Sequence, residues 1–208
     1  MDDPHAQSGT SVLKIEGGGT PNRPNAVDIP GTTNLGTTFT ISAMVKMTNK
    51  ALTRIFSSYR GEDDLGSYEV LFDVDPSGSA FGSAFPIVRA VIHGTWVTSP
   101  PGRVTIVRDK YHHFAMTYDD GDVTLYFDAQ KVGSGRVVPG GPVFSYYDLR
   151  VGHDWGGKSS YQQLVGYVDE ILILPQALEH TDIGVLARQG AEQYLAGVEL
   201  AKIRQLST

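Results

Sequence analysis

The segment between residues 146 and 163 contains the residue types that a sugar-binding surface needs. In such a surface an aromatic ring stacks on the apolar face of a pyranose, and planar polar side chains read its hydroxyl groups. Trp155 stands between polar neighbours and is followed by two glycines, which predicts an exposed ring. Trp96, the second tryptophan, could join a ligand surface or be buried. The glycan contacts that we predict are Trp155, Asp154, His153, Tyr161 and, from a separate charged loop, Arg60.

Three carboxylates in another segment have a spacing that would permit hydrolytic chemistry. Glu69, Asp73 and Asp75 fall on one face of an expected strand, because side chains alternate between the two faces. Two carboxyl groups about 5–5.5 Å apart can act as nucleophile and acid in glycoside hydrolysis. Asp75 is followed by Pro-Ser-Gly, however, which is typical of a turn. We therefore expect this face to be solvated, and the predicted function is not enzymatic.

Other catalytic or metal-binding patterns are absent from the sequence. His112 and His113 are adjacent, so on a strand they point to opposite faces and are poorly placed to chelate one metal. We expect packing or hydrogen bonding from them instead. The chain has no cysteine, no glycine-rich phosphate loop and no nucleophile elbow.

The bulk composition excludes several classes of protein. A length of 208 residues suits one domain. The 17 basic and 23 acidic residues give a net charge of −6 without clusters, which argues against a nucleic-acid partner. No apolar run approaches the roughly 20 residues that span a bilayer, so membrane insertion is not expected. The opening residues 1–4 lack the features of a signal peptide, and we interpret the chain as part of a larger exported protein with other domains.

The elements that must position these residues are mostly strands. Residues 111–133 predict a hairpin, in which two alternating runs flank the acidic turn 119–122. Similar alternating runs between Gly, Pro, Asn and Asp clusters predict an all-β sandwich. The expected strands are 12–16, 26–29, 38–47, 52–58, 67–74, 86–93, 103–108, 111–118, 122–128, 149–152 and 164–174.

The ends of the chain differ from its middle. Residues 1–11 are polar and expected to be flexible, and residues 12–189 are expected to form the sandwich domain. A helix is predicted after Pro175, and a second one in the extension 190–208. The second helix either packs over one sheet or begins a connection to another domain.

Several motifs resemble those of one family. The run from Tyr111 to Asp119 resembles W-H-H-V-A-x-x-Y-D-G, and residues 39–46 resemble F-T-I-S-A-W-V-K. Residues 149–152 and 166–171 resemble L-x-I-G and G-x-I-D-E-V. Over roughly residues 12–189 the chain thus resembles the laminin-G-like, concanavalin A-like lectin/glucanase superfamily. The resemblance implies a two-sheet antiparallel jelly-roll sandwich, all-β, with short C-terminal helices.

Three residues depart from the family pattern. Tyr111 and Met44 stand where tryptophan is usual, and Ala129 replaces the glycine of a turn that follows Asp128. The geometry of that turn is therefore open.

The resemblance also implies a structural calcium ion that ties the first strand to the last. Glu16 and Asp169 match the acidic positions of those two strands, and Ca²⁺ prefers oxygen ligands of this kind. Alternatively, both carboxylates face solvent or cap a turn.

By analogy with its fold, the chain is expected to be a non-catalytic carbohydrate-binding module of a larger extracellular or cell-surface protein, which is carbohydrate-active or adhesive. Its expected partner is an oligo- or polysaccharide. The alternatives are a laminin-G-like protein-interaction domain and, less favoured, a polysaccharide-degrading enzyme of the same fold.

Overall fold

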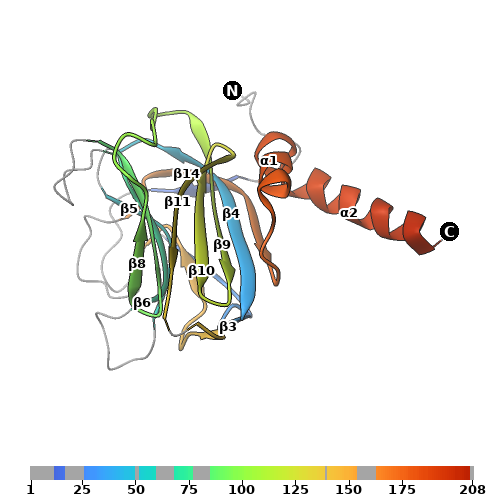
Figure 1. Cartoon of the computed structure of the whole chain (residues 1–208). Helices are drawn as coiled ribbons and strands as arrows, with labels where there is room; N and C mark the ends of the chain where they lie inside the picture. Colours follow the sequence, from blue (N-terminus) through green and yellow to red (C-terminus); the bar gives the residue numbers. More distant parts are fainter. Residues whose placement is uncertain are drawn as a thin grey trace.

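Two antiparallel six-stranded sheets, stacked face to face, form the body of the protein (Figure 1). The computed structural model describes residues 12–16, 26–49, 52–59, 68–76, 85–138, 140–153 and 163–206. The first sheet contains, in spatial order, β1 (Leu13–Ile15), β14 (Gly166–Leu174), β4 (Thr38–Met47), β9 (Tyr111–Asp119), β10 (Asp122–Phe127) and β11 (Gln130–Arg136). The second sheet contains β2 (Val27–Ile29), β13 (Leu149–Val151), β5 (Thr53–Tyr59), β6 (Tyr68–Asp75), β7 (Ile87–Ile92) and β8 (Thr95–Thr98). A small sheet pairs β3 (Asn34–Gly36) with β12 (Val143–Phe144). The predicted all-β antiparallel sandwich is confirmed.

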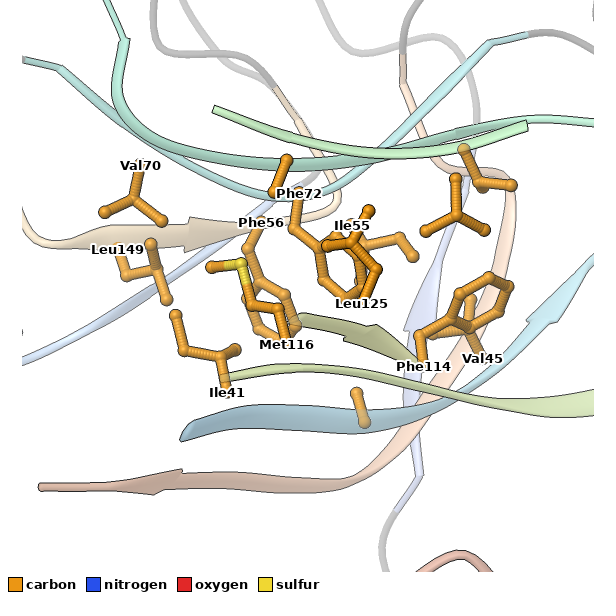
Figure 2. Packing of buried hydrophobic residues seen from close by; sticks show 14 of the residues in the cluster. Ile41, Val45, Ile55, Phe56, Val70, Phe72, Phe114, Met116, Leu125 and Leu149 are labelled. Carbon is orange, nitrogen blue, oxygen red and sulfur yellow. The ribbon is translucent and has the colours of Figure 1, made fainter. Parts of the chain in front are cut away.

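The core lies between the two sheets because every second residue of the long strands is apolar. Figure 2 shows side chains from both sheets meeting in this space, among them Phe72 and Phe114. Their ring centroids are 6.4 Å apart in an edge-to-face arrangement. Both side chains are fully buried, and burying a phenylalanine contributes roughly 1.5–3 kcal/mol.

The predicted hairpin is present as β9 and β10, with Tyr118 paired to Val123 across the turn. The next hairpin, from β10 to β11, turns at Asp128 and Ala129, whose φ angles are +46° and +67°. Two consecutive left-handed residues define the type I′ turn that matches the twist of a hairpin. Ala129 therefore keeps the left-handed geometry without being glycine.

The two predicted helices are α1 (His180–Gln189) and α2 (Ala191–Leu206). A second apolar cluster fixes α1 and the start of α2 on the outer face of the first sheet; its buried members are Ala115, Tyr126, Leu172, Leu178, Ile183, Leu186, Ala191 and Tyr194. A Glu170 carboxylate oxygen accepts a hydrogen bond of 2.6 Å from the first N–H of α2, where a negative charge is favourable. The rest of α2 runs away from the sandwich (Figure 1). None of the helices that the structure describes is both long and apolar enough to span a membrane.

The prediction of a strand over 103–108 is wrong. This segment is turn and coil, although Val104 is buried in the core and Ile106 packs against it. Its backbone groups find other partners: the N–H of Val107 donates to His112 Nε2 at 3.0 Å. The alternating pattern therefore came from packing alone, without a neighbouring strand. Sequence patterns also missed four short or glycine-rich strands, β3, β8, β11 and β12.

Candidate functional site

The outer face of the second sheet, which points away from the core, carries the main candidate site. On β6 the core residues Val70, Phe72 and Val74 alternate with residues of the outer face, which include Asp73 and Asp75. As predicted, these two carboxylates share a face. Both are nevertheless buried, at 0% and 1% exposure, so the expected solvation of this face is wrong at these positions. The side chain of Glu69 lies outside the described part of the structure.

Strand register places four polar residues in a row across this outer face. Arg54 of β5 pairs with Asp73 of β6, Asp73 with Arg89 of β7, and Arg89 with Thr98 of β8. We call Arg54, Asp73, Arg89 and Thr98 the polar row. It forms because the strand register brings one outward position of each of four neighbouring strands side by side.

Charge-assisted hydrogen bonds hold the first three members of the polar row together. Arg89 donates from Nε to Asp73 Oδ1 at 2.8 Å and from Nη2 to Asp73 Oδ2. Arg54 donates from Nη1 to Asp73 Oδ2. A bidentate arginine–carboxylate pair fixes direction as well as charge. The guanidinium of Arg89 is therefore held in one orientation.

The indole of Trp96 packs against the Arg89 guanidinium, which is held in this orientation. Trp96 follows Thr95 on β8, and its neighbour Val97 is in the core, so the indole lies on the outer face. The Arg89 guanidinium carbon lies 4.1 Å from the centre of the indole ring system, in a cation–π contact. Trp96 as a whole is still 49% exposed. The buried Asp73 therefore fixes Arg89, and Arg89 in turn supports the half-exposed aromatic surface of Trp96.

The chemistry open to Asp73 is restricted by its partners. Both of its carboxylate oxygens accept hydrogen bonds from guanidinium groups, and the side chain is fully buried. A general base or nucleophile needs a carboxylate oxygen within reach of a substrate. Asp73 is arranged to position Arg89 and Trp96 rather than to react.

Of the predicted glycan contacts, the structure describes only His153. It directly follows Gly152 after β13, its side chain is buried, and its carbonyl accepts a hydrogen bond of 2.7 Å from Ser57 Oγ. The ring is buried among the described residues, and its contact with a glycan stays a prediction. The other predicted contacts, Arg60, Asp154, Trp155 and Tyr161, lie outside the described residues.

The two predicted calcium ligands are not brought together. Ile15 pairs with Gly166 in the antiparallel β1–β14 ladder, so Glu16 lies beyond one end of the paired region and Asp169 beyond the other. The offset of about four residues corresponds to about 13 Å, whereas Ca²⁺–oxygen distances are about 2.3–2.6 Å. The Glu16 carboxylate forms an exposed ion pair of 2.5 Å with Lys14, and its pKa is lowered by that hydrogen bond. Asp169 Oδ1 accepts from the N–H of Glu170. These residues do not fit a shared calcium site, and the described part of the chain shows no cluster of three metal-binding side chains.

The two histidines point to opposite faces of β9, as predicted. His112 stacks on Phe127, and its Nε2 accepts from the N–H of Val107. Its Nδ1 therefore carries the proton and donates to Asp128 Oδ2 at 2.7 Å. Burial alone would raise the pKa of Asp128, but the hydrogen bonds from His112 and from the N–H of His113 lower it. This pair ties the hairpin turn to β9.

His113 lies on the outer face of the first sheet, among the residues below α1. Its Nε2 is 2.8 Å from Ser42 Oγ, and no polar group of the described residues contacts its Nδ1. Burial lowers the pKa of His113 to about 4, and the charge of Asp128 only partly opposes this effect. The side chain is a neutral packing residue at pH 7.

The sequence patterns gave no role for Arg54 and Arg89, and they left open whether Trp96 is exposed or buried. The available signal was limited to Arg89, a charged residue with an apolar neighbour on each side in an expected strand, Val88-Arg89-Ala90. The register that places these strands side by side could not be predicted from the sequence.

The comparisons with known proteins agree with this fold. None of the curated proteins matches the sequence significantly. The heptameric SAP-like pentraxin of Limulus polyphemus superposes with a TM-score of 0.59 at 13% identity, over 78% of this chain and 81% of the pentraxin. A putative carbohydrate binding protein of Bacteroides ovatus gives 0.56 at 15% identity, over 76% of this chain and 42% of that one. Domain 4 of AbnA, a GH43 extracellular arabinanase of Geobacillus stearothermophilus in complex with arabinotriose, gives 0.55 at 16% identity, over 83% and 86%.

At these identities the structures establish the fold alone. The sequence itself matches the model of the concanavalin A-like lectin/glucanases superfamily over residues 21–184, which is more than half of the chain. The protein therefore belongs to the concanavalin A-like lectin/glucanase superfamily.

Proposed function

We propose that this protein is a non-catalytic glycan-binding module, and that a saccharide ring stacks on Trp96 at the outer face of the second sheet. The observation that carries the proposal is the fixed, half-exposed indole, held by Arg89 and through it by the buried Asp73. A preorganised aromatic surface loses little entropy when a ligand stacks on it. Polar groups beside the ring then provide orientation.

Binding is favoured over catalysis by the state of the carboxylates. Asp73, whose position suited hydrolysis in the sequence, is fully engaged by two arginines. Two solved proteins with a similar fold are named as carbohydrate-binding or are bound to a sugar, which supports the same ligand class. The proposal includes an extracellular setting within a larger protein, as in the arabinanase that contains the similar domain.

The test begins with a glycan array, screened with and without EDTA, followed by calorimetry on each ligand that binds. Trp96→Ala is expected to weaken binding at least tenfold, the range of a central aromatic contact. Phe144→Ala is the matched control, because Phe144 is 55% exposed on β12 and not on this face. Circular dichroism checks that each variant is folded.

The two tryptophans allow a direct readout of the site. In a Trp155→Phe variant, Trp96 is the only tryptophan, and its fluorescence is expected to change on ligand addition. A signal that appears only in the reciprocal Trp96→Phe variant would move the site to the segment around Trp155. If neither the native chain nor the Trp96→Ala and Trp155→Ala variants bind any glycan, the protein-interaction alternative would be favoured.

A further inference from the structure

A groove whose described lining carries only basic charge lies next to the Trp96 surface. It lies where β8, the edge strand of the second sheet, meets β11, the edge strand of the first. Its volume is about 410 Å³, and its lining residues are Thr98, Pro100, Arg103, Lys131, Val132, Gly133 and Ser134. We call this feature the edge groove.

The floor of the edge groove depends on glycine and on a bulge. A Cβ at Gly133 would lie only 3.1 Å from Ser99 Cα and 3.2 Å from the carbonyl oxygen of Thr98. The two backbones approach this closely at Gly133, where a side chain would be crowded. A register shift between β10 and β11 leaves Val132 as the extra residue, buried between Lys131 and Gly133. Bulges at sheet edges commonly redirect neighbouring side chains.

The charge of the edge groove is opposite to that of the whole protein. Arg103 and Lys131 are exposed, and neither of them has an ion-pair partner in the part of the chain that the structure describes. The described lining contains no acidic side chain, although the chain carries a net charge of −6. The hydroxyls of Thr98 and Ser134 add hydrogen-bonding groups.

The edge groove and the proposed stacking site share strand β8, because Thr98 lines the groove. Trp96 and Thr98 lie two residues apart on the same face of β8, about 7 Å along the strand. Thr98 also pairs with Arg89, which holds the indole. A saccharide that extends from Trp96 along β8 would reach Thr98, which lines the edge groove together with Arg103 and Lys131.

We propose that the edge groove binds the carboxylate or sulfate group of an acidic polysaccharide whose adjoining sugar stacks on Trp96. This inference rests on the proposed function and adds the substrate class to it. Arg103 and Lys131 supply the charge, and the hydroxyls of Thr98 and Ser134 hydrogen-bond to the anionic group or its ring.

The experiment compares acidic saccharides with neutral counterparts by calorimetry. The ligands are oligogalacturonides against their methyl esters, and dextran sulfate against dextran, each at 50 and 500 mM NaCl. The acidic form is expected to bind at least tenfold more tightly at low salt, and the difference is expected to shrink at high salt because exposed charges are screened. The carboxylate and sulfate arms show which anion the groove accepts.

The variants separate groove charge from overall charge. The double variant Arg103→Gln/Lys131→Gln is expected to weaken acidic binding about tenfold. Arg108→Gln/Arg136→Gln removes the same charge from exposed positions outside the lining, and it is expected to change binding less than twofold. Equal effects of the two double variants, or equal affinity for acid and ester, would overturn the inference.

Two further outcomes distinguish this inference from the proposed function. One such outcome is that neutral glycans bind through Trp96 and that Arg103→Gln/Lys131→Gln leaves the affinity for acidic saccharides unchanged. This result would leave the proposed function intact and refute the acidic specificity. Polyglutamate that binds as tightly as the acidic saccharides, without dependence on Trp96, would show a general polyanion surface and refute the inference. No saccharide binding of either kind would refute both proposals.

Discussion

The buried His113 predicts a specific loss of stability in mild acid. Its folded-state pKa is about 4, against 6.5 for an exposed histidine, because burial disfavours the charged ring. The folded protein therefore binds fewer protons than the unfolded chain between these pH values. Stability is complete above pH 6.5 and declines as the pH falls toward 4.

The size of this effect follows from the shift. A difference of about 2.5 pKa units at 1.36 kcal/mol each gives a total of about 3 kcal/mol, of which about 2.5 kcal/mol is lost by pH 4.5. Asp128, whose pKa is lowered below 3.8, affects stability at lower pH and is separated from this window. A loss of this size is a large fraction of the roughly 5–15 kcal/mol that stabilises a typical domain.

The assay is urea unfolding at pH 7.5, 6.5, 5.5 and 4.5, with the native chain and His113→Gln. Glutamine can still contact Ser42 but does not titrate, so the variant is expected to lose about 2.5 kcal/mol less than the native chain over this range. His180→Gln is the control, because His180 is exposed at the start of α1, and it is expected to retain the native pH dependence. NMR titration of the His113 ring is expected to give a pKa near 4.

Two results would refute this reasoning. One is a His113→Gln variant with the same pH dependence as the native chain. The other is an NMR titration of His113 near 6.5, which would show that the ring is solvated or finds a partner for its proton.

Four other perturbations test the remaining structural arguments. Asp73→Asn is expected to lower the free energy of unfolding by about 3 kcal/mol, because two buried guanidinium groups lose their counter-charge; a variant as stable as the native protein in urea unfolding would contradict the ion cluster. Ala129→Gly is expected to raise it by about 0.5–1 kcal/mol, since glycine relieves the left-handed φ of +67°; a destabilised variant would show that the turn is not strained. Met44→Trp is expected to raise the midpoint of thermal unfolding by filling the cavity of about 120 Å³ that Met44 lines with residues of α1, by about 0.5–2 kcal/mol in free energy; a lower midpoint would indicate that the ring does not fit. EDTA is expected to leave that midpoint unchanged, because Glu16 and Asp169 lie at opposite ends of the β1–β14 ladder; a clear decrease would reveal a metal site made by other residues.

The long strands could be predicted because their alternation is local. Residues 111–118 and 122–128 predict the β9–β10 hairpin almost to its ends, and the faces of His112 and His113 follow from the same period of two. Local patterns predicted a strand over 103–108, where alternating apolar residues pack on the core without forming one. They missed β11, because its glycines interrupt the apolar alternation.

The tryptophan substitutions show a further limit of local patterns. Met44 and Tyr111, which stand at two usual tryptophan positions, are far apart in sequence but line the same cavity beside α1. The sequence indicates that one usual tryptophan ring is replaced by the smaller ring of Tyr111 and the other by the unbranched side chain of Met44. Only the β4–β9 register, which pairs Met44 with His113 two residues beyond Tyr111, shows that the missing volume is shared.

By itself the sequence determined the sandwich, the alternation of its strands and the family, because these depend on the period of side chains and on motifs within single segments. The tertiary structure decided which residues meet. Asp73 lies buried between two arginines instead of facing solvent, Trp96 is fixed as an exposed surface, and Glu16 is separated from Asp169. The physical reason is that ion pairing, burial and metal binding depend on the register between strands that are remote in sequence, and a shift of one residue moves every side chain to the other face.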